Sequence, residues 1–172
     1  MFTNEQANYL INLPKKILDN EKLVDSFMIR QKFPFTDRFI LGSQSDVEFT
    51  FLLEIYQSEK ASLKVSLYHQ EDQSKIGLLR IDFYGTHRNP ETIIDGLPDI
   101  FHKYAGKWFN YNEHHIHFYF QDYKPLAWAL PLIEDEFPIK DIKNNQDVGE
   151  AFLSFCKRIN LITKIDFENI LI

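Results

Sequence analysis

Four side chains that could take part in catalysis recur in two short alternating patterns of this 172-residue chain. Arg80 and Asp82 are separated by one apolar residue, and so are His115 and His117. Each pattern predicts a β-strand, on which residues two apart point to the same face with Cα atoms about 6.5–7 Å apart. We expect both pairs on the outward face of a half-buried sheet. If the two strands are neighbours, the four side chains form one patch.

Paired histidines could act as the base and the acid that transfer the 2′-hydroxyl of RNA to the adjacent phosphate. An arginine such as Arg80 would stabilise the charge that develops on the phosphate. Asp82 could orient one imidazole and raise its basicity. His87, in the loop after the first strand, would reach the same phosphate. We therefore expect metal-independent acid–base catalysis by a set of five residues: His115, His117, Asp82, Arg80 and His87.

Residues around this patch could hold the RNA. Cationic and amide side chains bind phosphate oxygens, and aromatic rings such as that of Trp108 stack on unpaired bases. The expected RNA-binding residues are Arg88, Asn89, Lys64, Tyr84 and Tyr119, with Tyr119 on the same outward face as the two strand histidines.

A second chemistry is metal-assisted. The His-x-His pair, Asp82 and either His87 or His102 would supply enough nitrogen and oxygen ligands for zinc or manganese. The spacing is weak support, because His-x-His recurs by chance and the His-Glu-x-x-His helix motif is absent. We therefore expect no metal ion and no other cofactor.

The same residues also fit an ordinary sheet surface. Cross-strand Arg–Asp pairs are common there, and a single histidine on such a face needs no function. A structural role is the simplest interpretation of His69, His102 and His114. All six histidines nevertheless lie between residues 60 and 120, beside a long loop at 85–112. This clustering favours a functional site, since long loops in compact domains are often functional.

The composition excludes several classes of protein. The formal net charge of −6 argues against a generic nucleic-acid coat protein, which would carry a basic stripe. Cys156 is the only cysteine, so a disulfide framework and a cysteine zinc site are excluded, and its helical apolar stripe predicts a core position. No apolar run approaches the roughly 18–20 residues of a membrane span, and no signal-peptide pattern begins the chain. We expect a cytoplasmic protein.

The motifs of several enzyme and DNA-binding classes are absent. The sequence contains no Gly-x-x-x-x-Gly-Lys phosphate loop, no Gly-x-Gly-x-x-Gly fingerprint and no Gly-x-Ser-x-Gly elbow. It also contains no helix-turn-helix or zinc-finger signature. A nucleotide-dependent enzyme and a sequence-specific DNA reader of those types are therefore disfavoured.

The pattern of apolar residues predicts a single α+β domain over residues 1–172. Thr3 and Gln6 form a capping box for a short N-terminal helix whose spacing continues to Leu18 with a break at Pro14. A second helix begins at Asp147. Strands are expected at 23–41 with a break, 47–56, 63–68, 76–84, 115–121 and 128–133. This order predicts a curved antiparallel sheet of about six strands, with the N-terminal and C-terminal helices packed on one face.

Two stretches carry a resemblance. The run Gly77-Leu78-Leu79-Arg80-Ile81-Asp82-Phe83-Tyr84-Gly85-Thr86-His87-Arg88-Asn89-Pro90, followed by His115-Ile116-His117-Phe118-Tyr119, resembles a small uncharacterised protein family of bacteria, their phages and other mobile elements. The resemblance covers most of the chain. The Arg-x-Asp, His-x-Asn-Pro and His-x-His pattern is also similar to the layout of small toxin ribonucleases, and to that suspected for a phage anti-CRISPR protein that truncates guide RNA. These likenesses imply an RNA-directed activity in a toxin–antitoxin or anti-defence setting.

Two functional hypotheses follow. The first is a small endoribonuclease acting on structured or protein-bound RNA, such as the guide RNA of a CRISPR effector whose basic surface would dock the acidic flanks of this chain. The second is a non-catalytic acidic inhibitor of a nucleic-acid-processing effector, with the histidines incidental. A homodimer is compatible with both. Replacing His117 by alanine would separate them, because only catalysis requires the imidazole.

Overall fold

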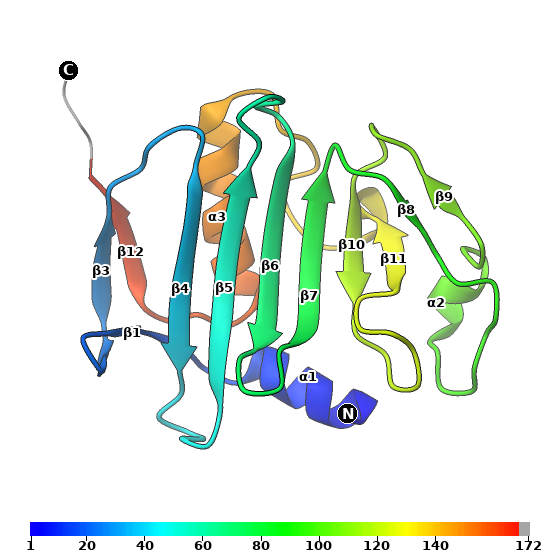
Figure 1. Cartoon of the computed structure of the whole chain (residues 1–172), viewed down its shortest axis with the longest axis horizontal. Coiled ribbons are helices and arrows are strands. Elements are labelled where there is room, and N and C mark those ends of the chain that lie inside the picture. The colour runs from blue at the N-terminus through cyan, green and yellow to red at the C-terminus, as the bar shows by residue number, and fades with distance from the viewer. Residues whose placement is uncertain (169–172) are drawn as a thin grey trace.

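A computed structural model of the chain describes residues 1–168 and places eight strands in one antiparallel sheet (Figure 1). The order across the sheet is β11-β10-β7-β6-β5-β4-β1-β2. Its strands are β1 (Lys16–Asp19), β2 (Lys22–Val24), β4 (Thr36–Gly42), β5 (Thr50–Gln57), β6 (Val65–Glu71), β7 (Ile76–Phe83), β10 (His115–Phe118) and β11 (Trp128–Pro131).

Two small strand pairs flank this sheet. At one end β3 (Ser26–Ile29) pairs in parallel with β12 (Lys164–Phe167), and at the other β8 (His87–Arg88) pairs with β9 (Trp108–Phe109). The mostly antiparallel sheet confirms the sequence-based prediction in outline. The sheet has eight strands rather than about six, because residues 16–18, predicted as helix, lie in β1, and the segment predicted at 23–41 is divided among β2, β3 and β4.

The N-terminal helix α1 (Asn4–Asn12) is shorter than predicted. It begins with the expected capping box, in which the Gln6 N–H donates to Thr3 Oγ1 and the Thr3 N–H donates to Gln6 Oε1. After Pro14, which has no N–H to donate, the chain enters β1, and Ile17 pairs with Leu41 of β4. The helical spacing up to Leu18 was therefore misleading.

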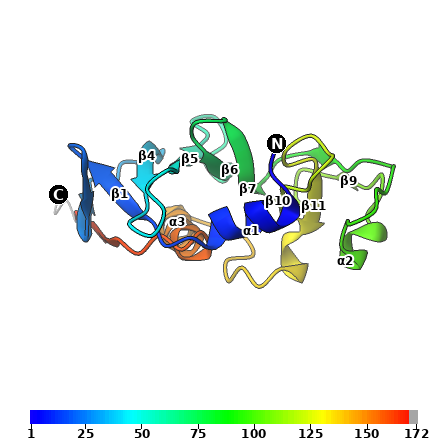
Figure 2. The ribbon, with the colours of Figure 1, turned by 90° about the horizontal axis from the view of Figure 1, so that it is seen from below.

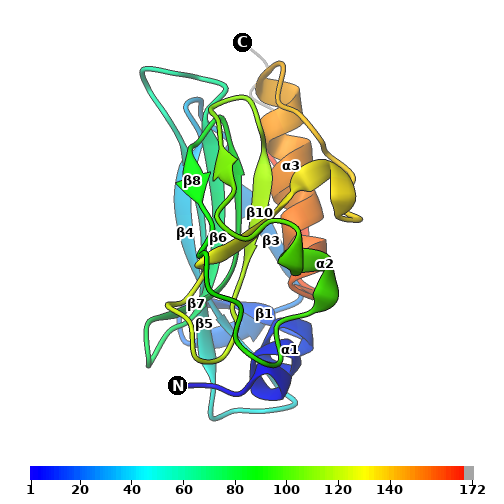
Figure 3. The same ribbon diagram turned by 90° about the vertical axis from the view of Figure 1, so that its right-hand side faces the viewer.

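The helices lie mainly on one side of the sheet. Figure 3 shows α3 (Asn145–Arg158) along one face and α1 below it on the same side, and Figure 2 shows both from the lower edge. Within the described residues a third helix, the single turn α2 (Asp99–His102), lies at the far edge near β11, inside the segment predicted as a long loop with one helical turn. A 3₁₀ turn (Leu132–Glu134) follows β11.

The core lies between the sheet and α3. Phe152 and Phe155 are fully buried there, and Cys156 is buried as predicted. Burying a side chain of this size stabilises a fold by about 1.5–3 kcal/mol. The helix begins two residues earlier than expected, because Asn144 Oδ1 accepts the N–H of Asp147 and caps it.

Residues 84–112 lie around the β10 end of the sheet (Figure 3): the β8–β9 pair covers the outer face, and Phe101 of α2 packs against Phe118 and Trp128 on the side that carries α3. The sequence predicted a loop with one helical turn here, and the structure adds the short β8–β9 pair to α2. This segment, called the flap below, determines how much of the outer face is accessible. No helix within residues 1–168 is long and apolar enough to cross a membrane.

Candidate functional site

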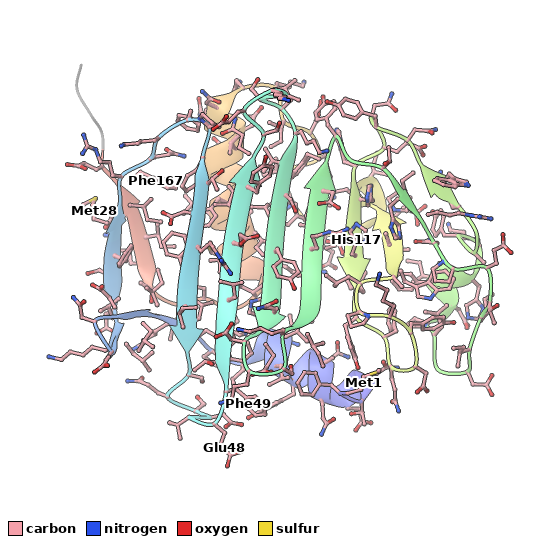
Figure 4. The ribbon with its side chains drawn as sticks, in the orientation of Figure 1. Met1, Met28, Glu48, Phe49, His117 and Phe167 are labelled. Atoms are coloured by element: carbon pink, nitrogen blue, oxygen red, sulfur yellow. The ribbon has the colours of Figure 1, made fainter. Side chains whose placement is uncertain are left out.

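The strands that carry the two predicted pairs are direct neighbours. In the antiparallel pairing of β7 and β10, His115 lies opposite Asp82 and His117 lies opposite Arg80. Directly opposed residues share a face, so the expected patch forms. Figure 4 shows His117 in the middle of β10, on the side next to β7.

Asp82 is at the centre of the patch. Its Oδ2 accepts a hydrogen bond from Arg80 Nε at 2.9 Å, and it lies 3.0 Å from His117 Nε2 and 3.8 Å from His115 Nε2. Burial opposes ionisation of this carboxyl, but His117 and Arg80 outweigh it and hold the pKa of Asp82 well below its usual range. Asp82 is therefore a carboxylate at neutral pH.

Backbone carbonyls orient both strand histidines. The His117 Nδ1–H donates to the Leu126 carbonyl at 3.0 Å, and the His115 Nδ1–H donates to the Glu113 carbonyl at 2.8 Å. A carbonyl oxygen can only accept, so each Nδ1 carries a proton and each Nε2 points toward Asp82. Burial is the main cause that lowers the pKa of His115 to about 4, so this ring is neutral at pH 7.

The two strand histidines are buried, contrary to the prediction of an outward, accessible face. Both are 0% exposed. The flap covers them, since the Phe109 ring packs 4.7 Å from that of His115, between ring centroids, and the His87 ring packs 4.5 Å from that of His117. Sequence periodicity placed them on the outer face correctly but could not show that the flap folds over it.

His87 belongs to both the buried cluster and the surface. It comes from β8, and its Nε2–H donates to the Ala127 carbonyl at 2.9 Å, with Asn89 Oδ1 at 3.1 Å. The ring is half-buried, and burial together with the neighbouring His117 lowers the pKa of His87 to about 4. His87 is therefore a neutral imidazole with its Nδ1 lone pair available.

A pocket of about 710 Å³ opens beside the cluster. Arg80 and His87 lie on its wall, and Leu126 and Ala127 complete the side nearest β10. Its other charged lining residues are the cations Lys75, Arg88 and Lys124 and, as the one carboxylate among the described residues of the wall, Glu91. The lining residues alone are therefore cationic in a chain whose net charge is −6, although Lys75 and Arg80 pair with Asp72 and Asp82 just outside the lining.

Only some of the predicted RNA-binding residues reach this pocket freely. Arg88 lines it, although its guanidinium pairs with Glu91 and lies over the Trp108 ring, 5.4 Å from the centroid. Asn89 also lies at the wall but is 1% exposed, and its amide bonds hold the Tyr104 and Ala129 backbone. This position gives the prediction of Asn89 as an RNA ligand no support, because its side chain anchors the flap.

The remaining predicted contacts lie elsewhere. Lys64 lines a separate pocket of about 190 Å³ that also touches Asp82. The Tyr84 hydroxyl, at the first residue of the flap, donates to Asp141 Oδ1, which also contacts His114 Nε2. Tyr119 is 4% exposed and donates to the Phe2 carbonyl, so its position does not support the predicted stacking on a base.

The other histidines have structural contacts, as their simplest interpretation predicted. The buried His69 Nδ1–H donates to the Leu52 carbonyl, and its ring stacks on Phe51. His102 Nε2–H donates to the Leu97 carbonyl within the flap. Sequence reasoning missed Lys75 and Lys124, which reach the pocket from two surface turns and show no sequence signal of their own.

The comparisons with known proteins give a family and no activity. A family model described as "Family of unknown function (DUF6978)" matches residues 2–161. Neither a curated protein nor a solved structure matches the chain. The function therefore has to be argued from the geometry and charge of the site.

Proposed function

The chain belongs to the DUF6978 family of unknown function, and from this premise we propose that it is a small endoribonuclease whose scissile phosphate binds in the pocket beside Arg80 and His87. The observation that carries the proposal is the cationic wall of this pocket, next to a histidine cluster, in an acidic chain. The reaction is the predicted transfer of the RNA 2′-hydroxyl to the phosphate, but Arg80 and His87, rather than His115 and His117, would touch the substrate.

The charge of the pocket favours a phosphate ester. The lining residues of the pocket include four cations and one carboxylate, that of Glu91. Lys75, Arg80 and Arg88 pair with Asp72, Asp82 and Glu91, and Lys124 has no ion pair within residues 1–168. A local cationic cleft concentrates anions even where the whole protein is acidic. Trp108, which is 61% exposed beside Arg88, offers a ring on which an unpaired base can stack.

Arg80 is the residue best placed to stabilise charge on the phosphate. One edge of its guanidinium is held by Asp82 and His117, and the side chain is about one-third exposed at the pocket. A donor fixed in this way stabilises developing charge without reorganising during the reaction. Asp82, His115 and His117 then act as positioning residues behind Arg80.

His87 is the base that can reach the pocket. Its Nε2–H is tied to the Ala127 carbonyl, which leaves Nδ1 to accept a proton from the attacking 2′-hydroxyl. The hydroxyl oxygen would bond to phosphorus as the bond from phosphorus to the 5′-oxygen breaks, and the leaving oxygen would take a proton from a pocket cation or water. The products would be a 2′,3′-cyclic phosphate and a free 5′-hydroxyl.

We also propose a substrate and a biological context for this activity. An acidic enzyme reaches RNA more easily when a basic protein already holds that RNA. Structured or protein-bound RNA, such as guide RNA in a CRISPR effector, is therefore the proposed substrate, and a toxin–antitoxin or anti-defence role in the cytoplasm is the proposed context.

The experiment compares labelled structured RNAs, free and effector-bound, with the wild-type protein and with Arg80→Ala and His87→Ala on a denaturing gel. Arg38→Ala is the matched control, because it removes an exposed arginine of β4 that lies outside the pocket. We expect discrete cuts with the wild type and Arg38→Ala, and loss of cutting with the other two. Cuts that survive both pocket variants would contradict the proposed site.

The non-catalytic inhibitor is the second candidate, and the uneven charge favours it. Basic and acidic residues are equal in number within residues 60–120, so the net charge of −6 comes entirely from the residues before and after this range. Intact RNA in every lane, together with tight binding to a basic effector that His87→Ala leaves unchanged, would favour this candidate over the enzyme.

A further inference from the structure

We propose that Asp82, His115 and His117 form a binding site for one divalent transition-metal ion, with Zn²⁺ as the best-fitting ion. The site lies directly behind Arg80 and His87, which line the cationic pocket. This departs from the sequence-based expectation that no metal is needed. The metal site goes beyond the proposed function, since it does not depend on RNA cleavage and can be measured in the absence of RNA.

The three ligand atoms are close enough to share one ion. Asp82 Oδ2 lies 3.0 Å from His117 Nε2 and 3.8 Å from His115 Nε2, and all three atoms lie within 4.8 Å of one another. Ligands about 2.0–2.1 Å from a tetrahedral zinc ion are roughly 3.3 Å apart. The separations of 3.0 and 3.8 Å lie on either side of that value, and small side-chain rotations would bring the two histidines together. Two imidazoles and one carboxylate are a donor set that zinc commonly takes.

The outer contacts of both histidines are those of metal ligands. A ligating histidine usually donates its other ring N–H to a backbone carbonyl or a carboxylate, which fixes its tautomer and orientation. His115 and His117 do this through Nδ1, toward the carbonyls of Glu113 and Leu126. Both Nε2 atoms are thereby aimed at the same side of Asp82.

One ligand atom is buried without a partner. His115 is 0% exposed, and its Nε2 has no hydrogen-bond partner within residues 1–168. Buried polar atoms are almost always paired, so an unpaired one needs an explanation such as an ion. A cation between His115 Nε2 and Asp82 Oδ2 would occupy this lone pair.

His117 Nε2 cannot satisfy both of its close contacts at once. If Nε2 is unprotonated, its lone pair faces the Asp82 carboxylate at 3.0 Å, which places two acceptors together. If Nε2 carries a proton, that N–H faces Arg80 Nη2 at 3.1 Å, which places two donors together. A metal ion on Nε2 and Asp82 Oδ2 removes this conflict once the guanidinium moves away.

Arg80 therefore competes with the metal. Its Nε and Nη2 contact the two atoms that the ion would take, Asp82 Oδ2 and His117 Nε2. Binding of the ion would release the guanidinium toward the pocket that it already lines. Removing the guanidinium should then strengthen metal binding, an effect that a purely structural role of the cluster does not predict.

The test is a calorimetric titration of EDTA-stripped, dialysed protein with zinc chloride, and separately with manganese chloride. Co²⁺ is used as a spectroscopic probe, because tetrahedral Co²⁺ absorbs strongly in the visible range. We expect one Zn²⁺ per chain, affinity at least tenfold weaker for His115→Ala and Asp82→Asn, and tighter binding for Arg80→Met. The matched control His102→Ala removes a histidine of the flap outside the cluster and should bind like the wild type.

Circular dichroism in the metal-free state checks that each variant is folded. If His115→Ala does not fold, Asp82→Asn still tests the site, because asparagine keeps the shape of the aspartate side chain. The proposal would be overturned if the wild-type protein bound less than one Zn²⁺ per chain in the titration. It would also be overturned if His115→Ala and Asp82→Asn both bound Zn²⁺ with the affinity of the wild type. Metal binding without RNA cleavage would leave the metal site standing and contradict the endoribonuclease. RNA cleavage by a chain that binds no metal would contradict the metal site and support the endoribonuclease.

Discussion

Arg80 and His117 are direct cross-strand partners on β7 and β10, and Arg80 Nη2 lies 3.1 Å from His117 Nε2. Through this contact the wall of the cationic pocket, to which Arg80 belongs, meets the buried cluster, to which His117 belongs. A change at either residue therefore alters the other. If both proposals hold, anion binding in the pocket and cation binding in the cluster will be coupled through the Arg80 guanidinium.

Arg80→Ala should weaken the binding of a short single-stranded oligoribonucleotide by about 10- to 100-fold, because a hydrogen bond to a charged group contributes about 1.5–3 kcal/mol. Fluorescence anisotropy of a labelled oligoribonucleotide measures the affinity. The salt dependence should also become shallower by about one phosphate contact. Arg38→Ala removes the same charge from β4 and should leave the affinity near that of the wild type. Equal losses in the two variants would contradict a specific role for Arg80.

Asp82→Asn should lower the free energy of unfolding by about 1–3 kcal/mol, because it removes the carboxylate that holds Arg80 while keeping the size of the side chain. Urea denaturation measures the change. In the double variant with Arg80→Ala the two losses should be less than additive, since the residues are in contact. Strict additivity would show that the ion pair contributes nothing to stability.

Asn89→Ala should loosen the flap. The buried amide bonds to the Tyr104 carbonyl, the Ala129 carbonyl and the Ala129 N–H. Its loss leaves these backbone groups without that partner, and each buried group left unpaired costs up to about 3 kcal/mol. We expect faster amide hydrogen exchange across residues 84–112 and quicker cleavage there by a protease. Asn110→Ala is the control, because within residues 1–168 the Asn110 side chain bonds only to nearby Glu113, and its loss should change exchange little. Unchanged exchange in Asn89→Ala would show that other contacts hold the flap.

Local sequence patterns predicted much of the central sheet and part of the site. Alternation identified β7 and β10 and placed Arg80, Asp82, His115 and His117 on one face, because side-chain direction in a strand depends only on its period of two. β5 and β6, which pair antiparallel, also correspond to the adjacent strands predicted at 47–56 and 63–68. These features depend on residues that are close together in the sequence.

The features that sequence reasoning missed depend on long-range packing. The flap buries His115 and His117 through Phe109 and His87, and no local pattern indicates which face a loop will cover. β12 pairs with β3 across more than a hundred residues, and Lys75 and Lys124 meet at the pocket from separate turns. The cationic pocket therefore became visible only in three dimensions.

The stability of the chain should rise with pH above neutrality because of Lys15, which is 0% exposed. Burial lowers the pKa of the Lys15 ammonium to about 7, below the roughly 10.4 of an unfolded lysine. Between these values the unfolded chain binds more protons, so the free energy of unfolding increases with pH.

The carbonyls of Ile11, Leu13 and Ile159 each accept a hydrogen bond from Lys15 Nζ at 2.8 Å, which favours the ammonium and limits the slope to about 1 kcal/mol per pH unit at most. Urea denaturation at pH 7, 8.5 and 10 measures this slope, and Lys15→Met should flatten it relative to the wild type. Tyrosines that also titrate near pH 10 contribute equally to both proteins, so they cancel in the comparison. Parallel pH profiles for the two proteins would mean that the three carbonyls fully offset burial and that Lys15 stays charged throughout.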